Sequence, residues 1–344
     1  MSDSRTQVLV VGSGLCGLAI AATAARRGLR VQCVSDGRPG ASLANFGQLH
    51  SGAVYAPVQP EVAQACWHYR DRWRSLIQSA RIGESHGYAI FSTTDAIDKY
   101  STAWRQIGID VAEVDARSAG ALTAHPPAVA AFRIPDIGVN LNVLHSRTTA
   151  FARSVGVPPV GLAKVRLHRD PQSTLVSTRS DSISADLVVL ATGADTPAIL
   201  TEMGIAHTLR SRRIAWGRYT GAQPNGLTYW LDGDLLAVNP DTDSTRIGLP
   251  GLEGTYGTSE AEYKRIRTAL DLRRMRNSEA NLRLHWGTVC DPAKPSDLIV
   301  DLRDPPPGWS RAANLIVALP GKWTTAWHCA EQVINSADQP IKIG

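Results

Sequence analysis

A glycine-rich turn near the start, "GSGLCG" at residues 12–17, constrains the fold more than any other feature. It follows an apolar run, "QVLVV" at 7–11, that has the length of a buried strand. The stretch after it, "LAIAATAARRG" at 18–28, is Ala-rich and ends in Arg26, Arg27 and Gly28, where a helix end favours basic residues and glycine. A second apolar run, "RVQCV" at 30–34, follows. This order predicts strand, tight turn, helix and strand, which is a βαβ unit.

Gly12, Gly14 and Gly17 give this turn the spacing G-x-G-x-x-G, directly after a strand and opening a helix. In that context the spacing is typical of a dinucleotide site, because the glycines let a pyrophosphate approach the N–H groups at the helix start. A tight turn that packs the helix and binds nothing is the alternative. An acid after the second strand usually binds the ribose; Asp36 is the candidate, although Ser35 stands at the first suitable position.

Two later segments repeat this strand-to-turn pattern. "DLVVLATGADTPAIL" at 186–200 predicts a buried parallel strand whose end, at Thr192 and Gly193, passes a ligand. "NLIVAL" at 314–319 predicts a strand, "PGKWTT" a turn and "AWHCAEQVI" a helix. "GLAKVRLHRD" and "STLVSTRSDSISAD" are interpreted as a strand and a hairpin, which completes a three-layer nucleotide domain.

The intervening blocks have a different pattern, with short alternating strands such as "LLAV" and "RIGLP" and one charged helix, "SEAEYKRIRTALDLRRMRNSE" at 259–279. They predict a mostly antiparallel second domain inserted twice into the first. We expect a nucleotide-binding domain at 1–81, 141–205 and 286–344, and a substrate domain at 82–140 and 206–285.

Composition excludes several classes of protein. The chain has 36 basic and 31 acidic residues. The basic residues are scattered along the chain, so a nucleic-acid partner is a weak hypothesis. Arg outnumbers Lys, which suits recognition of a carboxylate or a phosphate group. The five cysteines are widely spaced without a C-x-x-C pair, which indicates neither a disulfide framework nor a zinc site. No apolar run approaches the ~18 residues of a membrane span, and no leader peptide is recognisable. We therefore expect a cytoplasmic protein without an integral membrane segment.

Three pieces of the chain resemble the FAD-dependent oxidoreductases typified by D-amino acid oxidase, glycine oxidase and sarcosine oxidase: "VLVVGSGLCGLAIAATAARRGLRV", "ADLVVLATGADT" and "NLIVALPGKWTTAWHCAEQVI". Within that family, "NFGQLHSGAVYAP" at 45–57 is similar to a segment of L-2-hydroxyglutarate oxidases, and "PGKWTTAWHCAE" to one of FAD-linked glycerol-3-phosphate dehydrogenases. The resemblance implies an α/β fold with a Rossmann-type FAD-binding domain and an inserted, mostly antiparallel α+β substrate domain, like that of D-amino acid oxidase and glutathione reductase.

The resemblance also implies functional residues. The loop after the second strand would cross the flavin ring, with Gly47 and Gly52 allowing close approach and His50 facing the substrate. His50 is the candidate base, since a neutral imidazole accepts a proton near pH 7; a hydrogen-bonding role that positions the substrate and covalent attachment to flavin are the alternatives. Lys322 is the second catalytic candidate and would compensate charge on reduced flavin or substrate, unless it is a solvated turn lysine.

The resemblance assigns further residues to FAD and to the substrate. Those expected at FAD are Gly12, Gly14, Gly17, Ser35, Asp36, Asn45, Gly47, Gln48, Val165, Thr192, Gly193, Gly321, Lys322, Trp323, Thr324 and Thr325. Those expected at the substrate are Tyr55, Arg213, Arg218 and His285, for each of which a surface or core role is the alternative. "HWGTVCDP" lacks the arginine that relatives often carry there, which argues against a carboxylate clamp at 288–290.

Taken together, these features favour an FAD-dependent oxidase or dehydrogenase that oxidises a small, anionic hydroxy compound by hydride transfer to flavin N5. Amine or amino-acid oxidation on the same fold is the main alternative. A non-catalytic FAD-binding protein is a second alternative, and a nicotinamide-dependent dehydrogenase is disfavoured because it does not need the "LVVLATGA" and "PGKWTT" segments. The electron acceptor is expected to be oxygen, a quinone or another protein.

Overall fold

The computed structural model divides into two compact units, the first formed by residues 1–43, 145–212 and 288–344 and the second by 44–144 and 213–287. The residues that the structure describes are 6–38, 40–116, 119, 128–162, 166–169, 174–177, 182–220, 224–232, 236–241, 244–248, 259–272, 282–291 and 297–337. Within these ranges, no helix is long and apolar enough to cross a membrane.

The bounds of the two units differ from those of the predicted domains mainly at residues 44–81, which pack within the second unit. The reason is that Ala53, Val54, Ala56 and Ala63 belong to a core cluster of that unit. A compact unit is defined by packing and a functional domain by what it binds, so the predicted FAD-binding and substrate domains remain predictions.

A six-stranded sheet forms the centre of the first unit, in the order β19-β20-β13-β1-β2-β9. Its strands are β1 (Thr6–Val11), β2 (Val31–Ser35), β9 (Gly161–Leu162), β13 (Ala185–Leu190), β19 (Ile299–Asp301) and β20 (Leu315–Ala318). All neighbouring strands run parallel except β19 and β20 at one edge. The strands predicted at 7–11, 30–34, 186–190 and 314–319 are thus confirmed as neighbours in one sheet.

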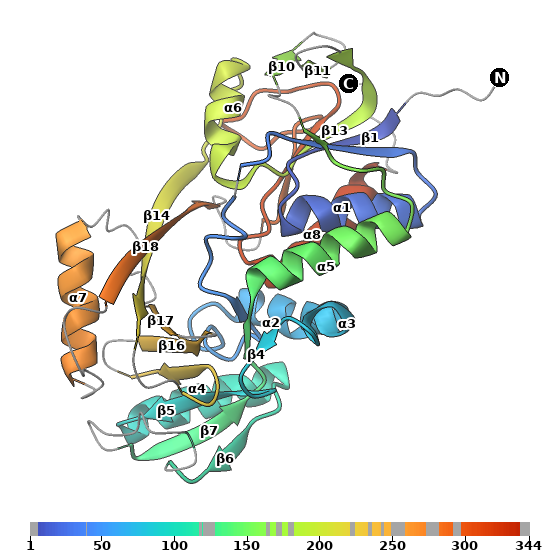
Figure 1. Ribbon diagram of the computed structural model, residues 1–344. Coiled ribbons are helices and arrows are strands. Elements are labelled where there is room, and N and C mark those ends of the chain that lie inside the picture. The colour runs from blue at the N-terminus through green and yellow to red at the C-terminus, as the bar shows by residue number, and fades with distance from the viewer. Residues whose placement is uncertain are drawn as a thin grey trace. The chain divides into compact units, whose positions relative to one another are not determined.

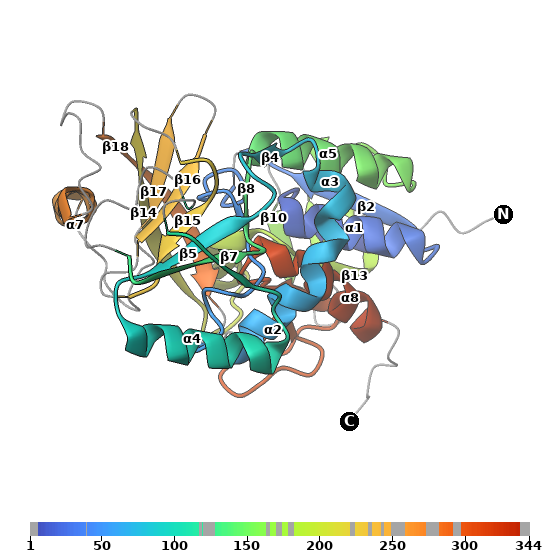
Figure 2. The same ribbon diagram turned by 90° about the horizontal axis from the view of Figure 1, so that it is seen from below.

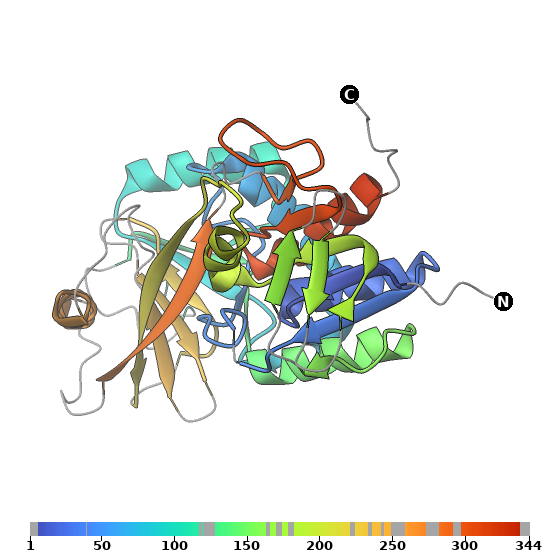
Figure 3. The same ribbon diagram turned by 90° about the horizontal axis from the view of Figure 1, so that it is seen from above.

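The sheet is covered on both faces (Figure 1). On one face lie α1 (Leu15–Arg26), α8 (Ala326–Ala337), which packs against α1, and α5 (Leu141–Ser154). On the other lies an antiparallel sheet of β10 (Arg166–Arg169), β11 (Thr174–Ser177) and β12 (Ser182–Ile183), which Figure 3 shows in front of the parallel strands. These three layers agree with the predicted nucleotide domain.

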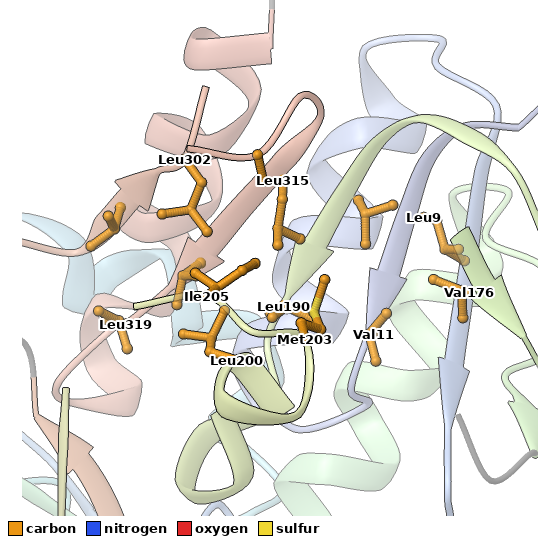
Figure 4. Close-up of a cluster of buried hydrophobic side chains, with 14 of the residues drawn as sticks. Leu9, Val11, Val176, Leu190, Leu200, Met203, Ile205, Leu302, Leu315 and Leu319 are labelled. Carbon is orange, nitrogen blue, oxygen red and sulfur yellow. The ribbon is translucent and has the colours of Figure 1, made fainter. Parts of the chain in front are cut away.

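The core on the β10–β12 side consists of aliphatic side chains from the parallel strands and their connections. Leu190 and Leu315 lie on adjacent strands, with Leu200 from α6 (Thr196–Glu202) and Met203 after it packed against them (Figure 4). Val176 of β11 belongs to the same cluster. This packing fixes the ends of β1 and β13, where the candidate ligand-binding turns begin.

An eight-stranded sheet forms the second unit, in the order β18-β14-β17-β16-β15-β5-β7-β6. Its strands are β5 (Gly87–Phe91), β6 (Ala112–Val114), β7 (Ala130–Ile134), β14 (Arg210–Tyr219), β15 (Thr228–Trp230), β16 (Leu236–Pro240), β17 (Thr245–Gly248) and β18 (Leu282–Asp291). From β14 to β6 the pairings are antiparallel except for β15 with β5, which agrees with the mostly antiparallel domain expected.

The two faces of this sheet contact different helices (Figure 2). Alternate residues such as Ala89, Tyr229 and Ala237 pack with α2 (Pro60–Tyr69) and α4 (Thr94–Ile107). The intervening residues, such as Trp230 and Val238, pack with α7 (Ser259–Leu272). Because strand side chains alternate between faces, the first face is also the one that carries Trp216, Arg218, Asn239 and Arg246.

Short elements complete the two units. A small sheet of β3 (Gln48–Leu49), β8 (Ile137–Val139) and β4 (Arg81–Ile82) lies in the second unit, where a 3₁₀ turn at Arg70–Trp73 and α3 (Arg74–Ile77) follow α2. In the first unit, 3₁₀ turns at Gly193–Asp195 and Trp323–Thr325 precede α6 and α8.

Candidate active site

Backbone contacts explain two of the three glycines in the first turn. Gly12 has φ +111°, and a Cβ there would lie 2.4 Å from the carbonyl oxygen of Ala191 at the end of β13. A Cβ at Gly17 would lie 1.9 Å from the carbonyl oxygen of Gly12. Any side chain at either position would therefore push the turn off β13 or α1 off the turn. The glycine spacing therefore serves tight packing of the turn, and its role in the approach of a ligand remains a prediction.

The start of α1 has the properties of an anion site. Gly14 is the N-cap, no side-chain cap is found for it within the described residues, and the first turn contains no acidic residue. Nearby, Ser42 Oγ accepts a hydrogen bond from the Leu15 N–H at 3.1 Å, and His145 Nε2 donates to the Ser13 carbonyl at 2.8 Å. The positive end of the helix dipole thus faces no carboxylate of its own first turn, which favours an anion. Sequence reasoning missed Ser42 and His145, which lie far from the motif in the chain.

The two ribose candidates stand at the end of β2 with different partners. Ser35 Oγ is buried and accepts the Gly37 N–H at 3.2 Å. The Asp36 carboxylate forms an ion pair with Arg38, whose backbone N–H also donates to Asp36 at 3.1 Å. Burial would raise the pKa of Asp36, but the bonds from Arg38 outweigh it and leave that pKa lowered. Asp36 is therefore an ionised, partly exposed carboxylate where an acid was expected.

The turns after β13 and β20 are also built as sequence reasoning expected. Gly193 and Gly321 have φ +56° and +65°, with open space where a Cβ would be. Thr192 Oγ1 lies 2.8 Å from Thr196 Oγ1. Lys322 caps the 3₁₀ turn Trp323–Thr325, and α8 begins directly after it without an acidic residue in its first turn.

Three residues of the last turn are buried: Trp323, Thr324 and Thr325. The Thr325 hydroxyl donates to the Lys322 carbonyl at 2.8 Å, so this threonine stabilises the turn itself. Val165, the remaining candidate of the first unit, lies outside the described residues.

In the second unit, segment 44–50 crosses the face of the sheet that carries Trp216 and Tyr229. Trp216 on β14 donates its indole N–H to the Ala44 carbonyl at 3.1 Å. On the next strand, β17, Arg246 donates to the Phe46 carbonyl at 3.2 Å. Each backbone carbonyl is therefore held by a side chain of a different strand.

The same arrangement continues toward the centre of the sheet. Asn239 on β16 donates to the Gly47 carbonyl at 2.7 Å, and Tyr229 on β15 lies 3.1 Å from Gln48 Oε1. Gly47 has φ +83°, and a Cβ there would lie 2.6 Å from the Val139 carbonyl oxygen. The Gly47 N–H donates to Asn45 Oδ1 at 3.1 Å. Segment 44–50 is thus fixed at four adjacent strands, and Gly47 is needed for a close approach to the chain itself.

His50 lies next in this segment and is only 4% exposed. Its Nδ1 is 3.3 Å from Asp136 Oδ2, and its Nε2 is 2.9 Å from Gln48 Nε2 and 3.2 Å from the Tyr55 hydroxyl. The pairing of β3 with β8 sets this geometry, because Leu49 opposite Ile137 places His50 beside Asp136. The structure therefore brings together three sequence candidates, His50, Tyr55 and Gln48, with an acid that was not among them.

Asp136 is fully buried and accepts several hydrogen bonds. Ser51 donates to it from its backbone N–H at 2.7 Å and from its hydroxyl, and the Tyr229 hydroxyl donates at 2.9 Å. Burial would raise the pKa of Asp136, but the hydrogen bond and charge of His50 and the bonds from Ser51 leave that pKa lowered. Burial and the Asp136 charge raise the pKa of Tyr229 well above its ordinary value. The site thus contains a buried carboxylate beside a neutral phenol.

The arginine and histidine candidates divide between the two faces of the sheet. Arg218 lies opposite Arg246 in the β14–β17 register, and the His285 ring stacks on Trp216 with centroids 4.3 Å apart. Burial and the charges of Arg218, Arg246 and Arg283 lower the pKa of His285. Arg213 lies an odd number of residues from Arg218 on β14, so its side chain is on the other face, over the Trp286 ring at 4.3 Å. Arg218 and His285 are therefore on the His50 side of the sheet, and Arg213 is not.

Comparison with solved structures identifies the fold of this protein. The structure of L-alpha-glycerophosphate oxidase from Mycoplasma pneumoniae, with FAD bound, aligns with a TM-score of 0.76 over 98% of this chain and 96% of that one, at 15% identity. Glycine oxidase from Geobacillus kaustophilus aligns with a TM-score of 0.74 over 97% and 95%, at 19% identity. The fold is thus that of FAD-containing oxidases.

The family follows from the sequence match. The model of the DAO family, described as FAD dependent oxidoreductase, matches residues 7–334, so this chain belongs to that family. One subunit of the anaerobic glycerol-3-phosphate dehydrogenase of Haemophilus influenzae is 30% identical over 145 residues, which cover 40% of this chain. The match spans 25% of that relative's own length.

FAD is the cofactor of this family, and the first unit fits it. The glycine turn and the α1 start without an acid are compatible with a pyrophosphate, and the ionised Asp36 after β2 is compatible with a ribose. The contacts of these residues with FAD remain predictions. The expected fold class and cofactor are confirmed.

Proposed function

We propose that this protein is an FAD-dependent oxidase or dehydrogenase of a small, anionic hydroxy compound, and that His50 accepts the hydroxyl proton. The observation that carries this proposal is the environment of His50. One ring nitrogen lies against a buried carboxylate, and the other lies beside the Tyr55 hydroxyl and the Gln48 amide. A histidine held in this way can take up a proton without leaving an unpaired charge in the protein interior.

Oxidation of an alcohol removes two electrons and two hydrogens from the substrate. Bound FAD supplies the oxidant, since its N5 accepts a hydride. With FAD bound, the substrate carbon would give up a hydride while the substrate O–H bond breaks, His50 would accept the proton, and a carbonyl product would form. Lys322, at the start of the turn before α8, is proposed to compensate negative charge, assisted by the positive end of that helix.

The anionic character of the substrate is inferred from the basic side chains on the His50 side of the sheet. Arg246 is paired with Asp241 at 3.0 Å and holds Phe46, so we assign it to loop support. Arg218 is the candidate for the acidic group; its Nε donates to Ser244 Oγ at 2.7 Å, which fixes the orientation of its guanidinium. Two similar proteins, one subunit of a glycerol-3-phosphate dehydrogenase and a glycerophosphate oxidase, bear names that support a hydroxy compound with an acidic group.

Amine or amino-acid oxidation is the second candidate, because glycine oxidase has nearly the same fold similarity. It needs the same hydride transfer but a different proton, since an amine must lose its ammonium proton before it reacts. A substrate panel therefore separates the two classes.

The test is anaerobic reduction of the purified, FAD-loaded protein by each compound of a panel. Loss of the flavin absorbance measures the reduction. The panel contains 2-hydroxy acids, glycerol phosphates, D- and L-amino acids and N-methyl amines. We expect hydroxy compounds with an acidic group to bleach the flavin fastest. Bleaching by amines alone would replace the proposal with amine oxidation, and reduction by dithionite but by no compound of the panel would argue for a non-catalytic flavoprotein.

A further inference from the structure

We propose that Asp136 is a positioning residue, which holds His50 as the tautomer with its proton on Nδ1 and thereby makes Nε2 the atom that accepts the substrate proton. This inference rests on the proposed function of His50, and it concerns a residue that sequence reasoning did not select. It follows from the direction in which each hydrogen bond of the buried cluster must run.

The first step is the charge of Asp136. The carboxylate accepts from the Ser51 N–H, the Ser51 hydroxyl and the Tyr229 hydroxyl. These groups approach both of its oxygens, and the residue has no exposed surface. A buried carboxyl with so many donors is ionised, because hydrogen bonds to the charged form favour it over the neutral acid. The hydrogen bonds from His50 and Ser51 are among the causes that lower the pKa of Asp136.

The second step is the position of the proton on His50. An ionised carboxylate accepts hydrogen bonds and cannot donate them. Nδ1 of His50 lies 3.3 Å from Asp136 Oδ2, so that nitrogen is the donor and carries the proton. In a neutral imidazole the other nitrogen then has a lone pair.

The third step is the surroundings of Nε2. The Tyr55 hydroxyl at 3.2 Å and the Gln48 amide nitrogen at 2.9 Å are both able to donate to it. The single proton of Tyr229 goes to the Asp136 carboxylate at 2.9 Å, because a bond to a charged acceptor is stronger than one to the Gln48 oxygen. With the proton of His50 on Nδ1, Nε2 can accept from Gln48 and Tyr55, which is the state that a base needs.

The titratable groups around this pair come from several elements. Tyr55, before α2, and Cys66, in α2, contribute to the raised pKa of Tyr229, and Arg70 of the 3₁₀ turn after α2 interacts with Asp136 through space. The Tyr229 phenol is neutral near pH 7, since its pKa is raised. Asp136 is a negative charge in contact with the His50 ring, and its attraction stabilises the imidazolium that proton transfer creates.

The decisive measurement is the tautomer of His50 in the FAD-loaded, full-length protein. Nitrogen-15 NMR of protein labelled at histidine distinguishes a protonated from an unprotonated ring nitrogen, and His50→Gln assigns the signal by its loss. We expect Nδ1–H in the wild type. A wild-type protein with Nε2–H would overturn the proposal, whether or not any substrate is oxidised, and this result needs no variant of Asp136.

Two variants then test the consequence. In Asp136→Asn the amide can donate to Nδ1, so we expect the proton of His50 to move to Nε2 and flavin reduction to slow by at least ~10² at pH 7. The remaining activity should have the acidic limb of its pH–rate profile at lower pH, because the imidazolium has lost its carboxylate. Tyr229→Phe is the matched control: it removes one bond to Asp136 but keeps the charge, so the tautomer should not change.

A merely structural role for Asp136 would give a different pattern. FAD content and thermal stability would fall together with the rate, while the acidic limb would stay where it is in the wild type. That outcome would contradict the proposal. Failure of the whole substrate panel, by contrast, would argue against the proposed function and leave the NMR result to decide the tautomer.

Discussion

At the scale of the residue, glycines near the site are needed for contacts that only the folded chain reveals. Gly52 has φ +95°, and a Cβ there would lie 2.3 Å from the carbonyl oxygen of Ala63 in α2. The sequence predicts that the backbone approaches something closely at Gly47 and Gly52. The structure shows that the nearest neighbours are Val139 and the Arg246 side chain at Gly47, and Ala63 at Gly52. Whether flavin also lies against this segment remains a prediction.

The substitution Gly52→Ala tests this close contact. Both positive φ and the clash with Ala63 should destabilise the protein. Gly156 is a matched control, with φ +98° and nothing within 4 Å of a Cβ. Gly156→Ala should cost about 1 kcal/mol for its backbone conformation alone, and Gly52→Ala roughly 1 to 3 kcal/mol more for overpacking. The free energy of unfolding in denaturant measures both. Equal losses would mean that the chain relaxes around Ala63 without cost.

At the scale of the element, an ion pair at the end of β19 is hydrogen-bonded to the end of α8. Arg303 pairs with Asp301 at 2.7 Å and donates to the Ser336 carbonyl at 2.6 Å, and the Ser336 hydroxyl donates to Asp301. A positive charge at a helix C-terminus is favourable. Burial would raise the pKa of Asp301, but the bonds from Arg303 and Ser336 leave that pKa lowered.

A lowered carboxyl pKa makes a stability contribution that depends on pH. The folded state favours the ionised form, so the contribution is fully present above the unfolded pKa of about 4 and is lost as pH falls through the lower, folded value. Asp301→Asn should therefore lower the free energy of unfolding more at pH 7 than at pH 3.5. The exposed Asp304 serves as control, and Asp304→Asn should change little at either pH. A loss from Asp301→Asn that does not vary with pH would show that the charge is not what stabilises this junction.

The elements themselves were predictable where the sequence pattern is local. The βαβ unit, the strands at 186–190 and 314–319 and the helix after Thr325 each have an apolar run and a glycine or proline boundary, and all were found. The β3–β8 pairing was not predictable, because strands of two and three residues have no periodicity. Asp136, in the turn before β8, becomes part of the site only through that pairing.

At the scale of the whole molecule, a dinucleotide site was predictable because its glycine motif is contiguous in sequence. The fold class and FAD followed from the resemblance of three separated pieces of the chain to FAD-dependent oxidoreductases. In the second unit, the register of strands that are distant in sequence decides which side chains share a face of the sheet. It brings four of them to one face: Trp216, Asn239, Tyr229 and Arg246. No local pattern encodes that register. This explains why the sequence identified His50 and Arg218 as candidates but could not separate Arg213 from them or find Asp136.

The role of His50 is tested most directly by the rate of anaerobic flavin reduction in wild type and His50→Gln, with the fastest substrate of the panel. Gln keeps a polar side chain in the buried site but cannot act as a base near pH 7. We expect reduction to slow by ~10² to 10⁴, which is the usual contribution of a general base, with the FAD content unchanged and the flavin still released by acid. Reduction at the wild-type rate would contradict the central role of His50, and loss of FAD from the variant would mean that this histidine holds the structure or the cofactor instead.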